Sequence, residues 1–98
     1  MTYLNQFLEK IKENDYPNFL KIWEEYCYSD EVNFEELKNV LLKTKESDLA
    51  QAFGQHVNRA LFLLEKIENP NQKHEILKLI ADIQTINDED LAILIYEN

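Results

Sequence analysis

The sequence has little of what sheets, disulfide frameworks and nucleic-acid surfaces require. Its 98 residues include one glycine, two prolines and one cysteine. Because hairpins and sheets need frequent turn residues, this scarcity argues against a β fold. A lone cysteine cannot form an internal disulfide, which is typical of a reducing compartment. Ten basic residues against 19 acidic ones leave a net charge of −9, with Arg59 as the only arginine. This balance argues against contact with nucleic acid or with anionic membranes.

Long hydrophobic runs are also missing from the chain. No run approaches the roughly 18–20 apolar residues of a membrane span, and the N-terminus lacks a signal-peptide pattern. We therefore expect a cytoplasmic protein.

The residues that are present favour helices. Apolar residues make up 45% of the chain, and they recur at spacings of three and four, together with much Leu, Glu and Lys. This pattern predicts an all-α fold of about six helices in three antiparallel hairpins. We expect them at residues 3–14, 17–28, 34–46, 48–67, 70–85 and from near Asp88 onward.

Capping signals support several of these boundaries. Thr2, Asn33 and Asn69 each precede an expected helix, where a side-chain oxygen can accept a free backbone N–H. Gly54 lies inside the fourth expected helix, which indicates close packing or a kink. The sixth runs into Asn98 without a stop signal, so we expect residues 1–98 to form one domain, an N-terminal fragment of a longer chain.

A weak internal repeat is visible. The tetrapeptide KEND at 12–15 has a counterpart, KESD, at 45–48, 33 residues later. This period predicts a short helical-repeat array of the HEAT or tetratricopeptide kind, and a compact helical bundle is the alternative. Either arrangement predicts a core that contains Leu8, Ile11, Leu20, Trp23, Leu37, Leu41, Phe53, Val57, Leu61, Leu64, Ile80 and Ile83, and Ile76 and Leu77 are also expected to face inward.

No pattern in the sequence predicts catalysis, a cofactor, a metal site or a small-molecule substrate. His56 and His74 belong to no ligand pair, and the acidic run at 87–90 lacks the ligand spacing of a calcium loop. Cys27 is expected to pack as a small hydrophobe. A Cys27–His56 pair is the one enzymatic alternative that the sequence leaves open.

The aromatic residues between Tyr16 and Tyr28 outnumber those that one helix face can bury. Aromatic residues are frequent anchors of protein interfaces, and an acidic turn follows them. We therefore predict a protein-binding surface formed by Trp23, Tyr26, Tyr28, Asp30 and Glu31, with Tyr28 exposed. Its carboxylates favour a partner with a basic, apolar groove.

Six segments resemble the helical N-terminal extension of chlamydial GreA-type transcription elongation factors. They are LKIWEEYC (20–27), SDEV (29–32), EEL (35–37), FGQ (53–55), EILK (75–78) and DIQTIN (82–87). The resemblance implies a parent protein that binds RNA polymerase and stimulates cleavage of backtracked transcripts. The coiled coil that carries this chemistry in such factors has no counterpart here, so no catalytic residue is carried over.

Two functions follow as hypotheses. The first is a non-catalytic protein–protein interaction module of a GreA-like factor, with RNA polymerase or another transcription component as its partner. The alternative is a stand-alone helical-repeat adaptor with an unrelated protein partner.

Overall fold

The computed structural model describes residues 2–87, and this range contains helices and no β-strand. The elements are α1 (Tyr3–Glu13), α2 (Tyr16–Cys27), α3 (Phe34–Lys45), α4 (Ala50–Phe53), the 3₁₀-helix η1 (Val57–Lys66) and α5 (Pro70–Asn87). The all-α prediction is therefore confirmed. The helix expected from Asp88 onward lies outside the described residues.

The first three helices begin at capping side chains. Thr2 and Asn33 accept hydrogen bonds from the backbone N–H groups of Asn5 and Glu36, at 3.2 and 3.0 Å. Helix α1 is capped at its C-terminal end by Asn14, whose φ of 56° is left-handed. The Asn14 and Asp15 N–H groups return to carbonyls of the last turn, the arrangement of a Schellman motif. These local signals account for helix bounds close to the predicted ones.

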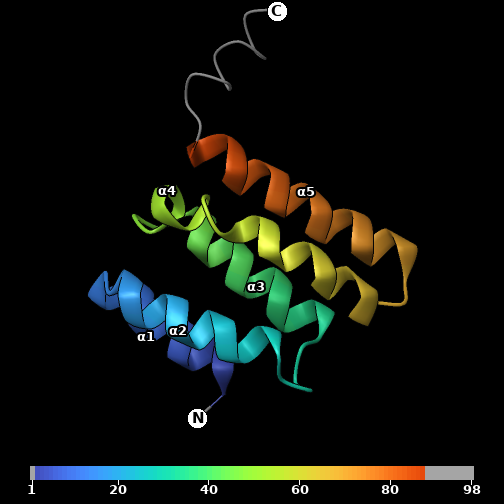
Figure 1. Cartoon of the computed structure of the whole chain (residues 1–98), viewed down its shortest axis with the longest axis horizontal. Helices are drawn as coiled ribbons and strands as arrows, with labels where there is room; N and C mark the ends of the chain where they lie inside the picture. Colours follow the sequence, from blue (N-terminus) through green and yellow to red (C-terminus); the bar gives the residue numbers. More distant parts are fainter. Residues whose placement is uncertain (1, 88–98) are drawn as a thin grey trace, which may run out of the picture.

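Figure 1 shows α1 and α2 side by side at one end of the molecule, α3 and η1 in the middle, and α5 on the far side. Helix α1 contacts α2 and α3, whereas α5 contacts α3, α4 and η1. Two ion pairs tie α3 to α5, between Lys38 and Glu75 at 3.2 Å and between Lys45 and Asp82 at 3.3 Å. The first and the last described helices are thus both packed on α3.

The prediction of one continuous helix from residue 48 to 67 is wrong. The segment is split into the four-residue α4 and the ten-residue η1. The break follows buried Gly54, which caps α4 at φ −54°, so no left-handed conformation requires glycine here. Since α2 is one unbroken helix and its counterpart in the second hairpin is two, the helical repeat stays a prediction.

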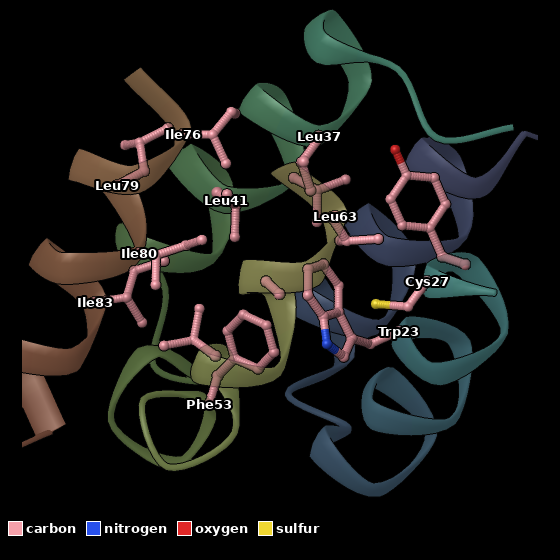
Figure 2. Packing of buried hydrophobic residues seen from close by; sticks show 14 of the residues in the cluster. Trp23, Cys27, Leu37, Leu41, Phe53, Leu63, Ile76, Leu79, Ile80 and Ile83 are labelled. Atoms are coloured by element: carbon pink, nitrogen blue, oxygen red, sulfur yellow. The ribbon is translucent and has the colours of Figure 1, made fainter. Parts of the chain in front are cut away.

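One continuous core runs through the molecule. Figure 2 shows isoleucine and leucine side chains of α5 meeting Leu41 of α3 on one side, with Phe53 and Leu63 filling the centre and Trp23 of α2 on the other side. Of the predicted core residues, seven are buried: Trp23, Leu37, Leu41, Phe53, Val57, Ile80 and Ile83. Leu8, Ile11, Leu20 and Leu64 are half-buried.

Two residues predicted to be inside are exposed. Leu61 and Leu77 each have 44% of their surface accessible, while Leu63 and Leu79 are buried. In η1 the cause is the helix type, because a 3₁₀-helix has three residues per turn. Val57, Ala60 and Leu63 therefore share the inner face, and Leu61 leaves it. In α5, Ile76, Leu79, Ile80 and Ile83 form the inner stripe at spacings of three and four, which leaves Leu77 outside.

Candidate protein-interaction surface

Helix α2 supplies most of the predicted binding residues, and the structure divides them into two groups. Trp23 and Tyr26 are 2% and 0% exposed, so neither presents its side chain to a partner. Tyr28, which follows the last residue of α2, is 82% exposed. Its exposure agrees with the prediction, whereas Trp23 and Tyr26 belong to the core.

The two buried rings are held by an aromatic cluster. Phe7 of α1 lies 6.1 Å from Trp23 and 5.7 Å from Tyr26 between ring centroids, both edge-on. Phe53 meets Trp23 edge-on at 5.0 Å. Such pairs add to the free energy gained from burial. Burial and the nearby charge of Glu36 also raise the pKa of Tyr26. Trp23 and Tyr26 therefore hold α2 in place.

Tyr28 pairs with a residue that the sequence did not single out. Its ring stacks on that of Phe62 in η1, with centroids 5.9 Å apart and planes 26° apart. Phe62 is itself 40% exposed. Both residues line a hollow between α2 and η1.

This hollow, which we call the Tyr28–Phe62 hollow, has a volume of about 280 Å³. Its remaining walls come from Leu20, Trp23, Glu24, Cys27 and His56. Leu20, Trp23, Cys27 and Phe62 provide apolar surface, and the carboxylate of Glu24 provides negative charge. Among the side chains that the structure describes, no lysine lines it.

A lysine fixes the end of α2 beside the hollow. Lys66, in the last turn of η1, donates hydrogen bonds to the carbonyl oxygens of Cys27 at 3.1 Å and Ser29 at 3.0 Å. A cation at the C-terminal end of a helix complements the helix dipole and the free carbonyls. The Ser29 hydroxyl also donates to the Tyr26 carbonyl at 2.7 Å. The turn that carries Tyr28 is therefore tied to η1.

The predicted acidic residues lie elsewhere. Asp30 and Glu31 are exposed, but neither lines the Tyr28–Phe62 hollow. Glu31 faces a separate, more open hollow with Tyr3, Asn33 and Glu36. The acidic side chain that the fold places beside Tyr28 is Glu24. A helical projection could have found Glu24, because it lies four residues before Tyr28. Phe62 and His56 could not be found that way, since they belong to other elements.

Cys27 and His56 do line the same hollow, as the enzymatic alternative requires. Cys27 is only 3% exposed, however, and burial raises the pKa of its thiol to about 12. At neutral pH the thiol is therefore protonated and weakly nucleophilic. Among residues 2–87, no cluster of three or more histidine, cysteine or acidic side chains could hold a metal ion.

Comparisons with known proteins relate this chain to transcription factors. It is 43% identical over 89 residues to the transcription elongation factor GreA of Chlamydia pneumoniae, and 37% identical over 91 residues to GreA of Chlamydia trachomatis serovar D. These matches cover 91% and 93% of the chain. The chain is homologous to part of chlamydial GreA.

The GreA relationship extends over a limited part of those proteins. The chain spans 12% and 13% of the length of the two GreA relatives. No protein-family model matches the chain, and no solved structure matches it significantly. Within the described part of the chain, no helix is long and apolar enough to cross a lipid bilayer. The matches thus show homology to a small part of GreA, and they do not say what the Tyr28–Phe62 hollow does.

Proposed function

We propose that this chain is the N-terminal helical extension of a GreA-type transcription elongation factor and acts there as a non-catalytic protein-interaction module. Its partner would be RNA polymerase or another component of the transcription complex, in the cytoplasm. The observation that carries the proposal is the 43% identity to a GreA factor over nearly the whole chain. The surface features are consistent with this role.

The negative charge of the chain favours a protein partner over nucleic acid. A surface that follows phosphates needs clustered Lys and Arg, whereas this chain has a net charge of −9. Two of its lysines, Lys38 and Lys45, are engaged with acidic residues of α5, and Lys66 is engaged with backbone carbonyls. We therefore expect no direct contact of this domain with DNA or RNA.

The decisive experiment is capture of purified RNA polymerase, from the organism that encodes the chain, on the immobilised 98-residue chain. We expect polymerase to be retained, and an unrelated acidic helical protein of similar charge should not retain it. If polymerase is not retained above that control, the proposed partner is wrong and the stand-alone adaptor is favoured. Filter binding to single- and double-stranded DNA at low salt should be negative, and tight binding would contradict the charge argument.

The non-catalytic part of the proposal has its own test. A thiol reagent should modify Cys27 slowly in the folded chain at neutral pH and rapidly once denaturant unfolds it, because a buried thiol is protonated and shielded. Fast labelling of the folded chain that is lost in His56→Ala would instead indicate an activated Cys27–His56 pair.

A further inference from the structure

The helix type of η1 is unusual for its length. A 3₁₀-helix uncommonly runs beyond about three or four residues, because its hydrogen bonds are poorly aligned, and a longer one often marks a hinge. Helix η1 keeps this form for ten residues, Val57–Lys66. The intrinsic preference of such a segment is an α-helix, so contacts outside the segment must hold η1 in the 3₁₀ form.

The apolar residues of η1 fit both helix types. In the 3₁₀-helix the buried face consists of Val57, Ala60 and Leu63. In an α-helix Leu61 and Leu64 would join Val57 on the inner face, at spacings of four and three. The exchange of Leu63 for Leu64 conserves volume, and such exchanges cost little. The α form would also bury Leu61, which is 44% exposed. Two packings of similar apolar content are therefore available to one segment.

The backbone before η1 permits the second form. Gly54 and His56, which lie between α4 and η1, already have right-handed helical φ and ψ. Residues 50–66, whose backbone the structure describes throughout, contain no proline and no left-handed φ. Neither α4 nor η1 has a side-chain cap that would fix its start. An α-helix could therefore extend over residues 50–66 without a change of handedness at any residue.

The two forms differ in the directions of their outer side chains. Successive side chains turn by about 120° in a 3₁₀-helix and by about 100° in an α-helix. Relative to Val57, the direction of Phe62 would therefore change by about 100° and that of Lys66 by about 180°. The contacts that Phe62 and Lys66 make thus depend on the helix type.

Both residues contact the end of α2. The ring of Phe62 stacks on that of Tyr28, with centroids 5.9 Å apart. Lys66 donates hydrogen bonds to the carbonyl oxygens of Cys27 at 3.1 Å and Ser29 at 3.0 Å. We call these contacts together the α2 latch. Because an α-helix would turn both side chains away, the α2 latch forms only with the 3₁₀-helix.

From these observations we infer that residues 57–66 are a conformational switch between a 3₁₀-helix, held by the α2 latch, and an α-helix that buries Leu61 and Leu64 in place of Leu63. Release of the latch converts the first form into the second. A partner that binds Tyr28 and Phe62 together finds them side by side in the 3₁₀ form only, so it stabilises that form. The switch is a property of the chain itself and goes beyond the proposed function.

NMR spectroscopy of the isotopically labelled 98-residue chain tests the switch. Scalar couplings across hydrogen bonds identify the acceptor of each amide, which lies three residues back in a 3₁₀-helix and four back in an α-helix. In the unmodified chain, the couplings within residues 57–66 should run three residues back. Relaxation dispersion should detect exchange of these amides with a minor form on the microsecond to millisecond timescale. The amides of α3 are the internal control and should show no such exchange.

Variants of the α2 latch should shift the equilibrium. Tyr28→Ser and Lys66→Met should each raise the ratio of the α form to the 3₁₀ form about threefold, and the double variant about tenfold, because two separate contacts are lost. Lys43→Met, at an exposed lysine in the last turn of α3, is the control and should leave the ratio unchanged.

A variant at Leu61 should act in the opposite direction. Leu61→Ser changes an exposed position of the 3₁₀ form, so the chain should fold normally. The α form would bury the new hydroxyl group, which is unfavourable without a hydrogen-bond partner. Exchange in residues 57–66 should therefore disappear in this variant.

Four results would overturn the inference. Couplings that run four residues back in the unmodified chain would show that the α-helix is the stable form. A 3₁₀ pattern that persists in the double variant would show a single fixed conformation. Loss of both coupling patterns there would show that the α2 latch orders the segment without selecting its helix type. Exchange that persists in Leu61→Ser would show that the minor form does not bury Leu61. All four are measured on the chain alone, so none of them decides whether polymerase is the partner.

Discussion

The α1–α2 pair and the α4–η1 segment bury apolar side chains by different means. In the pair, side chains of Thr2 and Asp15 cap the helices and Asn14 closes the turn between them. Neither α4 nor η1 has a side-chain cap at its start. The pair is also filled by rings, whereas η1 contributes Val57, Ala60 and Leu63. Helices whose ends carry capping residues thus keep the α-helical period of about 3.6 residues per turn. A segment without side-chain caps takes the helix type that its tertiary contacts favour.

The comparison is tested most strongly by removing a ring from the pair. Phe7→Ala should lower the free energy of unfolding by about 3–5 kcal/mol, because the side chain is fully buried and its loss leaves a cavity. Phe7 is 0% exposed and contacts Phe19, Trp23 and Tyr26. Urea denaturation followed by circular dichroism measures the change. Leu77→Ala, at an exposed position, is the control and should cost less than about 1 kcal/mol.

The second prediction distinguishes the 3₁₀-helix from an α-helix in the same segment. Leu63→Ala should cost about 2–5 kcal/mol, as expected for a buried leucine. Leu61→Ala should cost less than about 1 kcal/mol, since this residue is 44% exposed. The two variants are matched in chemistry and lie two residues apart, so each serves as the other's control. The reverse order of losses would mean that residues 57–66 form an α-helix that buries Leu61.

These two segments also show how far the sequence could predict the fold. The α1, α2, α3 and α5 ranges follow from caps and from apolar residues at helical spacing, and the described bounds lie within two residues of them. In residues 48–67, the spacing Val57, Leu61, Leu64 fits an α-helix, and Val57, Ala60, Leu63 fits a 3₁₀-helix equally well. The contacts of η1 with α5 and with the rest of the core decide between the two helix types. Because these contacts are tertiary, the local sequence could not predict the outcome.

The candidate site, like residues 48–67, could be predicted only in part from the sequence. Exposure of Tyr28 could be predicted, because it follows the apolar stripe of α2 and precedes a polar turn. The Tyr28–Phe62 stack could not, because it depends on the direction in which η1 projects Phe62. Asp30 and Glu31 lie next to Tyr28 in the sequence, yet Glu24, about one helical turn before it, is the acidic residue that lines the hollow.

The third prediction concerns the contact that joins the two regions. Lys66→Met should lower the free energy of unfolding by about 1 kcal/mol, because two charge-assisted hydrogen bonds to Cys27 and Ser29 are lost at an exposed position. Methionine preserves most of the aliphatic side chain. Lys43→Met, also an exposed lysine in the last turn of a helix, is the control and should be nearly neutral. Equal losses in both variants would show that Lys66 contributes only through general charge.

The smallest expected effect is a change in the pKa of Asp15, whose side chain caps the start of α2. The Asp15 carboxylate accepts hydrogen bonds from the Asn18 side-chain amide at 2.7 Å and from the Asn18 backbone N–H at 3.4 Å. The side-chain bond is the main cause that lowers the pKa of Asp15 below its usual 3.8.

A group whose pKa is lower in the folded chain stabilises it above the unfolded pKa, and this contribution is lost as pH falls through the folded pKa. Asn18→Ala should therefore raise the pKa of Asp15, because the largest of the interactions that lower it is lost. Carboxyl carbon shifts in an NMR titration measure the pKa directly. Asn71→Ala, in the first turn of α5, is the control and should leave the Asp15 titration unchanged. If Asn18→Ala also leaves the pKa of Asp15 unchanged, the hydrogen bond between Asp15 and Asn18 does not form in solution. The start of α2 would then resemble the uncapped starts of α4 and η1.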